Sequence, residues 1–185
     1  MRIHQIDFCQ ALNLPSSRKY EHEGRPGLAA CFDVITRYSA QPAKDRLNLI
    51  SWTIFNFLIG NADAHAKNLS LLLTLGGISL APFYDLVCTA AYAGLTEKLA
   101  LNVGGENRPE WIQPCHWEEF ASVTGANPRI VWKRLQELAD SLPKTSRDVA
   151  AMLKLETPEQ ALVERICSTI GARAQRLSGA VRPQA

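Results

Sequence analysis

The sequence predicts a mainly α-helical fold that contains one small β-hairpin. Apolar residues recur at helical spacing through most of the chain, as in helices that bury one face. The exception is a pair of short apolar runs joined by Gly76-Gly77, a dipeptide that favours a tight turn between two strands. Hydrophobic residues make up 46% of the 185 positions and charged residues 21%, so we expect a packed core rather than disorder.

The N-terminal part is expected to hold two helices and a loop. Ile3 to Leu14 is predicted as a short helix that Pro15 closes, and a polar loop follows from Ser16 to Pro26. A second helix follows the loop, because apolar residues recur there at helical spacing. These residues are Leu28, Cys31, Phe32, Ile35 and Tyr38.

A longer helix is predicted from about Pro42 to Ile59. Proline is tolerated in the first turn of a helix, and Gly60 follows the last turn as a typical C-terminal cap. Apolar side chains surround most of the circumference of this helix. We therefore expect it to be buried at the centre of the fold.

The hairpin is predicted over residues 69–84. Its outgoing arm is Leu69–Leu75, and its returning arm begins with the apolar run Ile78–Ala81. A further short strand is expected at Leu99–Val103, where the pair Gly104-Gly105 would end it.

The remainder of the chain is expected to be helical. Asn127-Pro128 is typical of a helix start, with Asn as the N-cap and Pro in the first turn, and Pro143 is predicted to stop this helix. Thr157-Pro158-Glu159-Gln160 matches a capping box and begins the last helix. Residues 179–185 are predicted to be a frayed tail.

Composition argues against several classes of protein. The net charge of +2 and the pI of about 8.3 are too mild to indicate nucleic-acid binding by themselves. The most apolar stretch, Leu47–Ile59, is interrupted by polar residues and is shorter than the roughly 20 residues of a membrane span. The first residues lack the apolar core of a signal peptide, and the five cysteines are widely spread, as in reduced proteins. We expect a cytoplasmic protein with no membrane partner.

The most informative stretch is Asn61–Asn68, which is mostly polar although it joins a buried helix to a buried strand. Polar groups at such a junction cost free energy unless they are bonded or line a cleft. Both arms of the predicted hairpin have seven residues, so the returning arm should bring Asp85 next to Asp63 and Asn68. Two carboxylates and an amide oxygen are the hard oxygen ligands that suit Mg²⁺.

This arrangement resembles the core of protein kinases, in which a catalytic-loop Asp is followed five positions later by a metal-binding Asn, and a second metal-binding Asp follows a hairpin. The local sequence motifs are similar to those of the HipA family. Its pattern Asn-x-Asp-x-His-x-Lys-Asn is met at Asn61–Asn68, and its pattern Ala-Pro-x-Tyr-Asp is met at Ala81–Asp85. The resemblance covers most of the chain from residue 3 to roughly residue 150.

The resemblance implies a protein-kinase-like C-terminal lobe, the HipA C-terminal domain, over residues 1–185, with residues 61–68 as its catalytic loop. It implies that Asp63 is the general base, that His65 braces the loop and that Lys67 meets phosphate charge. It also implies that Asn68 and Asp85 bind Mg²⁺ and, through it, ATP.

Further expectations follow from the family alone. HipA-like proteins are bacterial serine/threonine kinases that act as toxins in toxin–antitoxin pairs, with a HipB-like antitoxin as partner and an aminoacyl-tRNA synthetase as a possible substrate. A kinase also needs a glycine-rich loop and a lysine from an N-terminal lobe, and the sequence shows neither. We therefore expect this N-lobe to be absent from the chain and to be supplied in cis or in trans.

Three other interpretations fit the sequence. The first is a non-catalytic remnant or lobe that binds an antitoxin or a separate N-lobe. Residues 117–140 resemble a helix-turn-helix, with Arg129, Lys133 and Arg134 on its second helix, which would indicate DNA binding. A Zn²⁺ hydrolase that uses Asp63, His65 and Asp85 is also conceivable, although a further histidine ligand is lacking.

Overall fold

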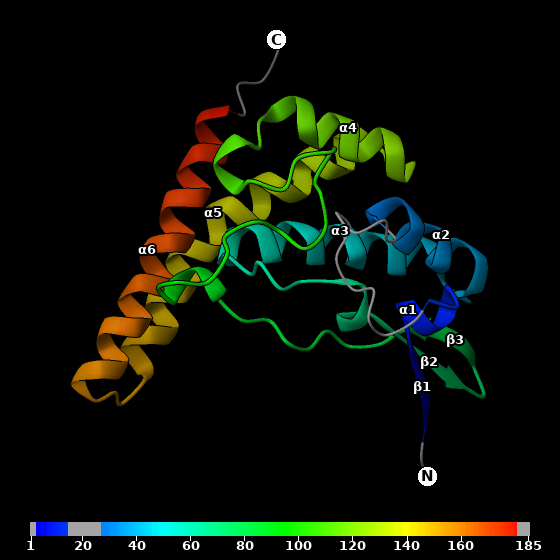
Figure 1. Ribbon diagram of the computed structural model, residues 1–185, viewed down its shortest axis with the longest axis horizontal. Helices are drawn as coiled ribbons and strands as arrows, with labels where there is room; N and C mark the ends of the chain where they lie inside the picture. The colour runs from blue at the N-terminus through cyan, green and yellow to red at the C-terminus, as the bar shows by residue number, and fades with distance from the viewer. Residues whose placement is uncertain (1–2, 15–26, 181–185) are drawn as a thin grey trace.

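A computed structural model describes residues 3–14 and 27–180 (Figure 1). Helices dominate, and a small three-stranded antiparallel sheet lies at the end of the molecule where the chain begins. The predicted fold class is confirmed. The longer helices are α2 (Leu28–Tyr38), α3 (Pro42–Ile59), α4 (Pro114–Thr124), α5 (Pro128–Met152) and α6 (Thr157–Ala180). The shorter elements are β1 (His4–Asp7), α1 (Phe8–Ala11), β2 (Ser70–Thr74) and β3 (Gly77–Leu80), with 3₁₀ turns η2 (Ala66–Asn68), η3 (Thr89–Ala91) and η4 (Pro109–Trp111).

Helix α3 is the central element, as predicted, and α2, α5 and α6 pack around it. It begins with Pro42 in its first turn and ends at Gly60, whose φ of 77° gives the left-handed cap that glycine adopts without strain. Its residues Leu49, Ile54 and Leu58 are completely buried. The helix therefore delivers the chain from the middle of the core directly into the polar segment that follows.

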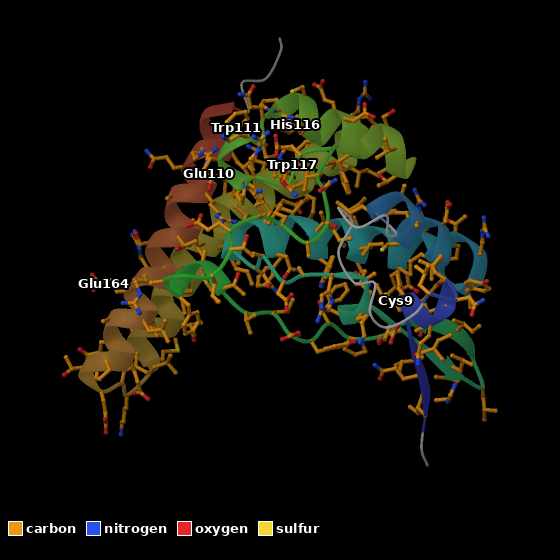
Figure 2. The ribbon with its side chains drawn as sticks, in the orientation of Figure 1. Cys9, Glu110, Trp111, His116, Trp117 and Glu164 are labelled. Atoms are coloured by element: carbon orange, nitrogen blue, oxygen red, sulfur yellow. The ribbon has the colours of Figure 1, made fainter. Side chains whose placement is uncertain are left out.

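Aromatic residues join α3 to the helices beside it. The Phe57 and Trp117 rings meet edge to face with centroids 5.5 Å apart, and Trp117 meets Phe120 in the same way at 5.8 Å. Phe120 in turn contacts Phe32 of α2 at 5.8 Å. Trp117 lies below α4 on the side that faces the rest of the molecule (Figure 2). The first helix of the predicted helix-turn-helix is thus part of the core.

The predicted N-terminal helix over residues 3–14 is wrong. Residues His4–Asp7 form strand β1, which pairs antiparallel with β2 in the register Asp7 to Ser70, and helix is confined to Phe8–Ala11. Asp7 starts this short helix, because its carboxylate accepts from Gln10 N while its own N–H donates to the Gln10 side chain. Pairing with a distant strand outweighs the local helical pattern.

The hairpin is shorter than the predicted range 69–84. Its strands β2 and β3 occupy 70–74 and 77–80, and residues 81–88 continue as an irregular segment. The predicted strand Leu99–Val103 is wrong, because only an isolated bridge between Val103 and Glu106 forms there. Leu99 and Ala100 instead donate to carbonyl groups of loops, and these bonds hold the buried segment in place.

Pro143 does not end its helix, which contradicts the prediction. Helix α5 continues past it to Met152, because α6 packs along this stretch and compensates for the one backbone hydrogen bond that proline cannot donate. The predicted loop 16–26 lies outside the described residues. In the predicted tail, residues 179 and 180 belong to α6, and residues 181–185 are outside the described part. None of the helices in the described ranges is long and apolar enough to span a membrane.

A close backbone contact fixes the turn at Gly104. Its φ is 55°, and a Cβ atom placed on this residue would lie only 2.0 Å from the carbonyl oxygen of His116 in α4. The next residue, Gly105, also has a positive φ of 84°, but a Cβ atom there would meet no atom within 4 Å. A side chain at Gly104 would meet both a clash and an unfavourable backbone conformation, whereas one at Gly105 would meet only the unfavourable conformation.

We predict that Gly104→Ala lowers the free energy of unfolding by about 2 to 4 kcal/mol, because it adds a clash with α4 to the strain of a left-handed alanine. Gly105→Ala should cost only about 1 kcal/mol, because it adds the strain alone. Urea unfolding followed by tryptophan fluorescence measures both values. Equal destabilisation by the two substitutions would contradict the packing described here.

Candidate functional site

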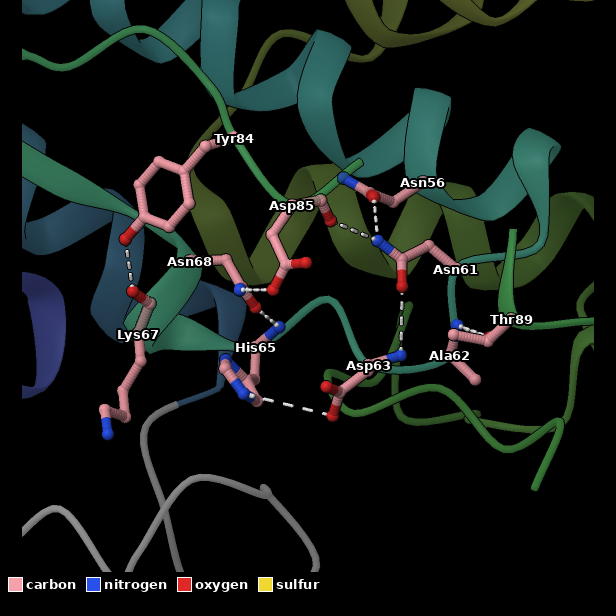
Figure 3. A network of polar contacts seen from close by, with 10 residues as sticks. All are labelled: Asn56, Asn61, Ala62, Asp63, His65, Lys67, Asn68, Tyr84, Asp85 and Thr89. Carbon is pink, nitrogen blue, oxygen red and sulfur yellow. Dashed lines mark hydrogen bonds and ion pairs between the residues drawn. The ribbon is translucent and has the colours of Figure 1, made fainter. Parts of the chain in front are cut away.

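The polar loop 61–68 lies beside the irregular segment that follows β3, and hydrogen bonds join the two along their length (Figure 3). At one end, Asn68 Nδ2 donates to Asp85 Oδ2 over 2.6 Å, and the Tyr84 hydroxyl donates to the Lys67 carbonyl over 2.6 Å. At the other end, the Thr89 hydroxyl accepts from Ala62 N over 2.8 Å. The structure thus brings Asp85 next to Asn68, as the hairpin spacing predicted.

Asn61 makes three hydrogen bonds through its buried side chain, and these link α3, the loop and the segment after β3. Its Nδ2 donates to the Asp85 carbonyl at 3.0 Å and to Asn56 Oδ1 at 2.8 Å, and its Oδ1 accepts from Asp63 N at 3.1 Å. Asn56 is itself buried in α3 and donates to the Trp52 carbonyl. Because buried polar groups are costly unless bonded, this network favours a single conformation of the loop.

Asn56 and Thr89 were missed as site residues by the sequence reasoning. Asn56 had a visible signal, since it is the one polar residue within the apolar run Ile54–Ile59. Thr89 had none, because its role depends on where the chain passes after Asp85.

His65 and Asn68 hold the second half of the loop. His65 N donates to Asn68 Oδ1 over 2.9 Å, and this bond fixes which end of the Asn68 amide faces Asp85. The His65 side chain is buried, and its Nε2 lies 3.9 Å from Asp63 Oδ1. The Asp63 side chain remains 47% exposed, so its carboxylate faces solvent.

Lys67 is placed differently from the other predicted site residues. Its carbonyl accepts from the Tyr84 hydroxyl, while its side chain extends away from Asn68 and Asp85 in Figure 3. In this arrangement its backbone stabilises the loop.

Asp85 adopts an unusual backbone conformation. Its φ is 58°, in the left-handed region that side-chain-bearing residues rarely occupy. Asn68 contacts its carboxylate and Asn61 contacts its carbonyl, so bonds on both sides maintain this conformation. Backbone strain of this kind is common where a side chain must be aimed at a ligand.

The donor atoms present fit Mg²⁺ better than Zn²⁺. Asp85 supplies a carboxylate, and Asn68 Oδ1 keeps a second lone pair besides the one that accepts from His65 N. Such a small set of oxygen ligands suits Mg²⁺, which keeps waters and binds substrate phosphates. Within the described ranges, no cluster of three or more His, Cys, Asp or Glu residues could hold a metal, so the zinc hydrolase reading gains no support.

Two of the three basic residues of the predicted helix-turn-helix are engaged within the chain. Arg134 Nε donates to Ser51 Oγ of α3 over 2.8 Å, and its Nη1 pairs with Glu137 over 2.8 Å. Lys133 Nζ also lies 3.9 Å from Glu137. Two of the three side chains proposed for DNA contact are therefore partly neutralised by the protein itself.

A separate ion pair follows the Gly104-Gly105 turn. The guanidinium of Arg108 donates to both carboxylate oxygens of Glu106 over 2.9 and 2.7 Å and stacks on the Trp111 ring at 3.7 Å. Hydrogen bonds from the Arg108 side chain, and then from its backbone N–H, lower the pKa of Glu106 to about 2. This pair fixes the turn that packs against α4.

The fold and the arrangement of loop and hairpin define a protein-kinase-like C-terminal lobe. Comparison with known proteins gives the family: residues 1–146 match the profile of the HipA-like C-terminal domain. The chain belongs to this family.

Individual relatives agree with this assignment. The chain is 42% identical over 153 residues to the kinase candidate Y4mE of Sinorhizobium fredii, covering 83% of this chain and 36% of that protein. It is 30% identical over 192 residues to the serine/threonine-protein kinase toxin HipA of Shewanella oneidensis, covering 98% of this chain and 44% of the toxin. The chain therefore spans less than half the length of these relatives.

A solved structure has the same fold. It is the complex of HipA, HipB and operator DNA from the toxin–antitoxin system of Shewanella oneidensis MR-1. The TM-score is 0.85 at 29% identity, and the match covers 97% of this chain and 45% of that chain.

We predict that the Glu106 carboxyl group titrates near pH 2 and that Arg108→Ala raises its pKa toward the ordinary glutamate value of 4.5. Because the folded-state pKa is lowered, the stabilisation by this pair is complete above the ordinary pKa and is lost as the pH falls toward 2. NMR of the side-chain carboxyl carbon measures the titration. An ordinary pKa for Glu106 in the wild-type chain would contradict the ion pair.

Proposed function

We propose that this chain is the catalytic lobe of a HipA-like serine/threonine protein kinase, which transfers the γ-phosphoryl group of ATP to a hydroxyl of a protein substrate. The observation that carries the proposal is the 2.6 Å contact between Asn68 and Asp85, which joins the loop of Asp63 to the segment after the hairpin. The contact joins the counterparts of the two metal-binding residues of kinases, on the loop that also carries the counterpart of the catalytic Asp. The relative named as a kinase toxin supports it.

Each residue has a role that its position allows. Asn68 and Asp85 would hold Mg²⁺, and Mg²⁺-ATP, when bound, supplies the phosphoryl group. Asp63, whose carboxylate is partly exposed, would orient the substrate hydroxyl and accept its proton. As the new bond forms from the hydroxyl oxygen to the γ-phosphorus, the bond to the β–γ bridging oxygen breaks and ADP leaves.

His65 and Asn61 would act through the loop rather than on the substrate. Asn61 holds the backbone of Asp63 and of Asp85, and His65 orients Asn68 through its backbone N–H. Catalysis of phosphoryl transfer depends on positioning, so these bonds matter for rate even though no covalent chemistry passes through them.

The proposal also includes partners that lie outside this chain. The chain spans less than half of each relative, which supports an N-terminal lobe, in cis or in trans, that covers the phosphates. The solved relative is a complex with HipB, which supports a HipB-like antitoxin as partner. The cytoplasm is the expected compartment. A chain that binds these partners without transferring phosphate is the competing function, and the following measurements distinguish the two.

We predict that Asp85→Asn weakens the binding of Mg²⁺-ATP at least tenfold, because it removes the only carboxylate in the proposed metal shell. Calorimetric titration measures this with the N-terminal lobe supplied. Asp140→Asn, which makes the same change on the exposed face of α5, is the matched control and should bind as the wild type does. Unchanged affinity in Asp85→Asn would refute the metal assignment.

We predict that Asp63→Asn lowers kcat by about 100-fold or more, because the hydroxyl loses its proton acceptor. The KM for ATP should stay within about twofold, since Asp63 is not part of the proposed metal shell. Transfer of labelled phosphate to a protein substrate measures both constants, and the exposed α2 variant Asp33→Asn is the control. Full activity in Asp63→Asn would exclude it as the base.

A further inference from the structure

The Thr89 hydroxyl bonds two backbone groups at the start of the proposed catalytic loop, one on each side of Asn61. Its Oγ1 donates to the Gly60 carbonyl over 3.0 Å and accepts from Ala62 N over 2.8 Å. Gly60 is the C-terminal cap of α3, and Ala62 immediately precedes Asp63. The hydroxyl therefore spans Asn61, the residue that bonds the backbone of Asp85.

The loop depends on this hydroxyl for a backbone hydrogen bond. Ala62 is buried, and its N–H points to Thr89 Oγ1. A buried backbone N–H left without a partner is costly, so loss of the hydroxyl would favour a rotation of the peptide between Asn61 and Ala62. Because Asp63 is the next residue, such a rotation would displace its carboxylate.

The turn that carries Thr89 is itself held from two directions. Ala90 N donates to the Gly60 carbonyl over 3.0 Å, and Arg165 of α6 donates to the Ala91 carbonyl over 3.1 Å. The packing at this point is tight, since a Cβ atom added to Gly60 would lie 2.9 Å from Ala90 Cβ. Turn η3 is thus fixed between the end of α3 and helix α6, and the Thr89 hydroxyl has a defined position.

We propose that Thr89 is a positioning residue of the kinase site. Thr89 lies in the segment that follows Asp85, and it bonds the loop that carries Asp63. It therefore sets the distance between the base Asp63 and the metal ligand Asp85. The inference rests on the proposed function. It assigns to Thr89 no contact with substrate or metal, and its whole effect passes through the two backbone groups that its hydroxyl bonds.

The test compares Thr89→Val, which keeps the shape and removes the hydroxyl, with Thr89→Ser, which keeps the hydroxyl. With the N-terminal lobe supplied, Thr89→Val should lower kcat about tenfold or more while the KM for ATP changes less than about twofold. Thr89→Ser should restore kcat to within about threefold of the wild type. Thr124→Val, which removes a buried hydroxyl bonded to a backbone carbonyl in α4, is the matched control and should keep wild-type kcat.

Amide hydrogen exchange at Ala62 tests the contact without any catalysis. Thr89→Val should speed exchange at this amide about tenfold or more relative to amides of the α3 interior, and Thr89→Ser should not. If the wild type transfers no phosphate while the exchange result holds, the proposed function fails and the contact stands. Wild-type exchange at Ala62 in Thr89→Val, or wild-type kcat in that variant, would overturn the inference.

Discussion

The buried amide of Asn61 is the constraint on which the site depends. It lies where α3 ends, and its three hydrogen bonds reach α3, the backbone of Asp63 and the backbone of Asp85. An unbonded amide at this depth would be costly, so the loop and the segment after β3 are stable only when they lie together. The requirement to satisfy one buried side chain thereby holds the two proposed catalytic carboxylates in the same place.

The segment that follows β3 runs along helix α3. At its start, the buried Asp45 carboxylate accepts from Leu80 N over 2.9 Å, where β3 ends. In its middle, the Trp52 ring lies 6.3 Å from the Phe83 ring. At its end, the Gly60 carbonyl accepts from the Thr89 hydroxyl. Residues 80–89 therefore follow the helix from one end to the other, and this path, rather than the hairpin alone, decides where Asp85 lies.

The sequence predicted the parts of this arrangement that depend on local pattern. The bounds of α3 were predicted from Pro42 and Gly60, and the approach of Asp85 to Asn68 was predicted from the hairpin, although its strands are shorter than the predicted arms. The errors came from interactions between distant residues. Strand β1 exists because β2 offers it a free edge, and α5 passes Pro143 because α6 packs beside it. The spacing of residues in the sequence carries little information about either contact.

Helix α6 belongs to the same structural unit as the site, although all of it lies beyond the residues 1–146 that match the family profile. Its buried Arg173 donates to the Phe57 carbonyl over 2.6 Å, in the last turn of α3 before the loop 61–68. Burial lowers the pKa of Arg173, so its charge must be compensated locally. The negative end of the α3 dipole and the Phe57 ring, 5.5 Å away, both favour a cation here. This contact fixes the end of α3, and the Arg165 bond fixes turn η3, which carries Thr89. The geometry of the proposed active site is therefore set partly by residues that a comparison restricted to the catalytic motifs would leave out.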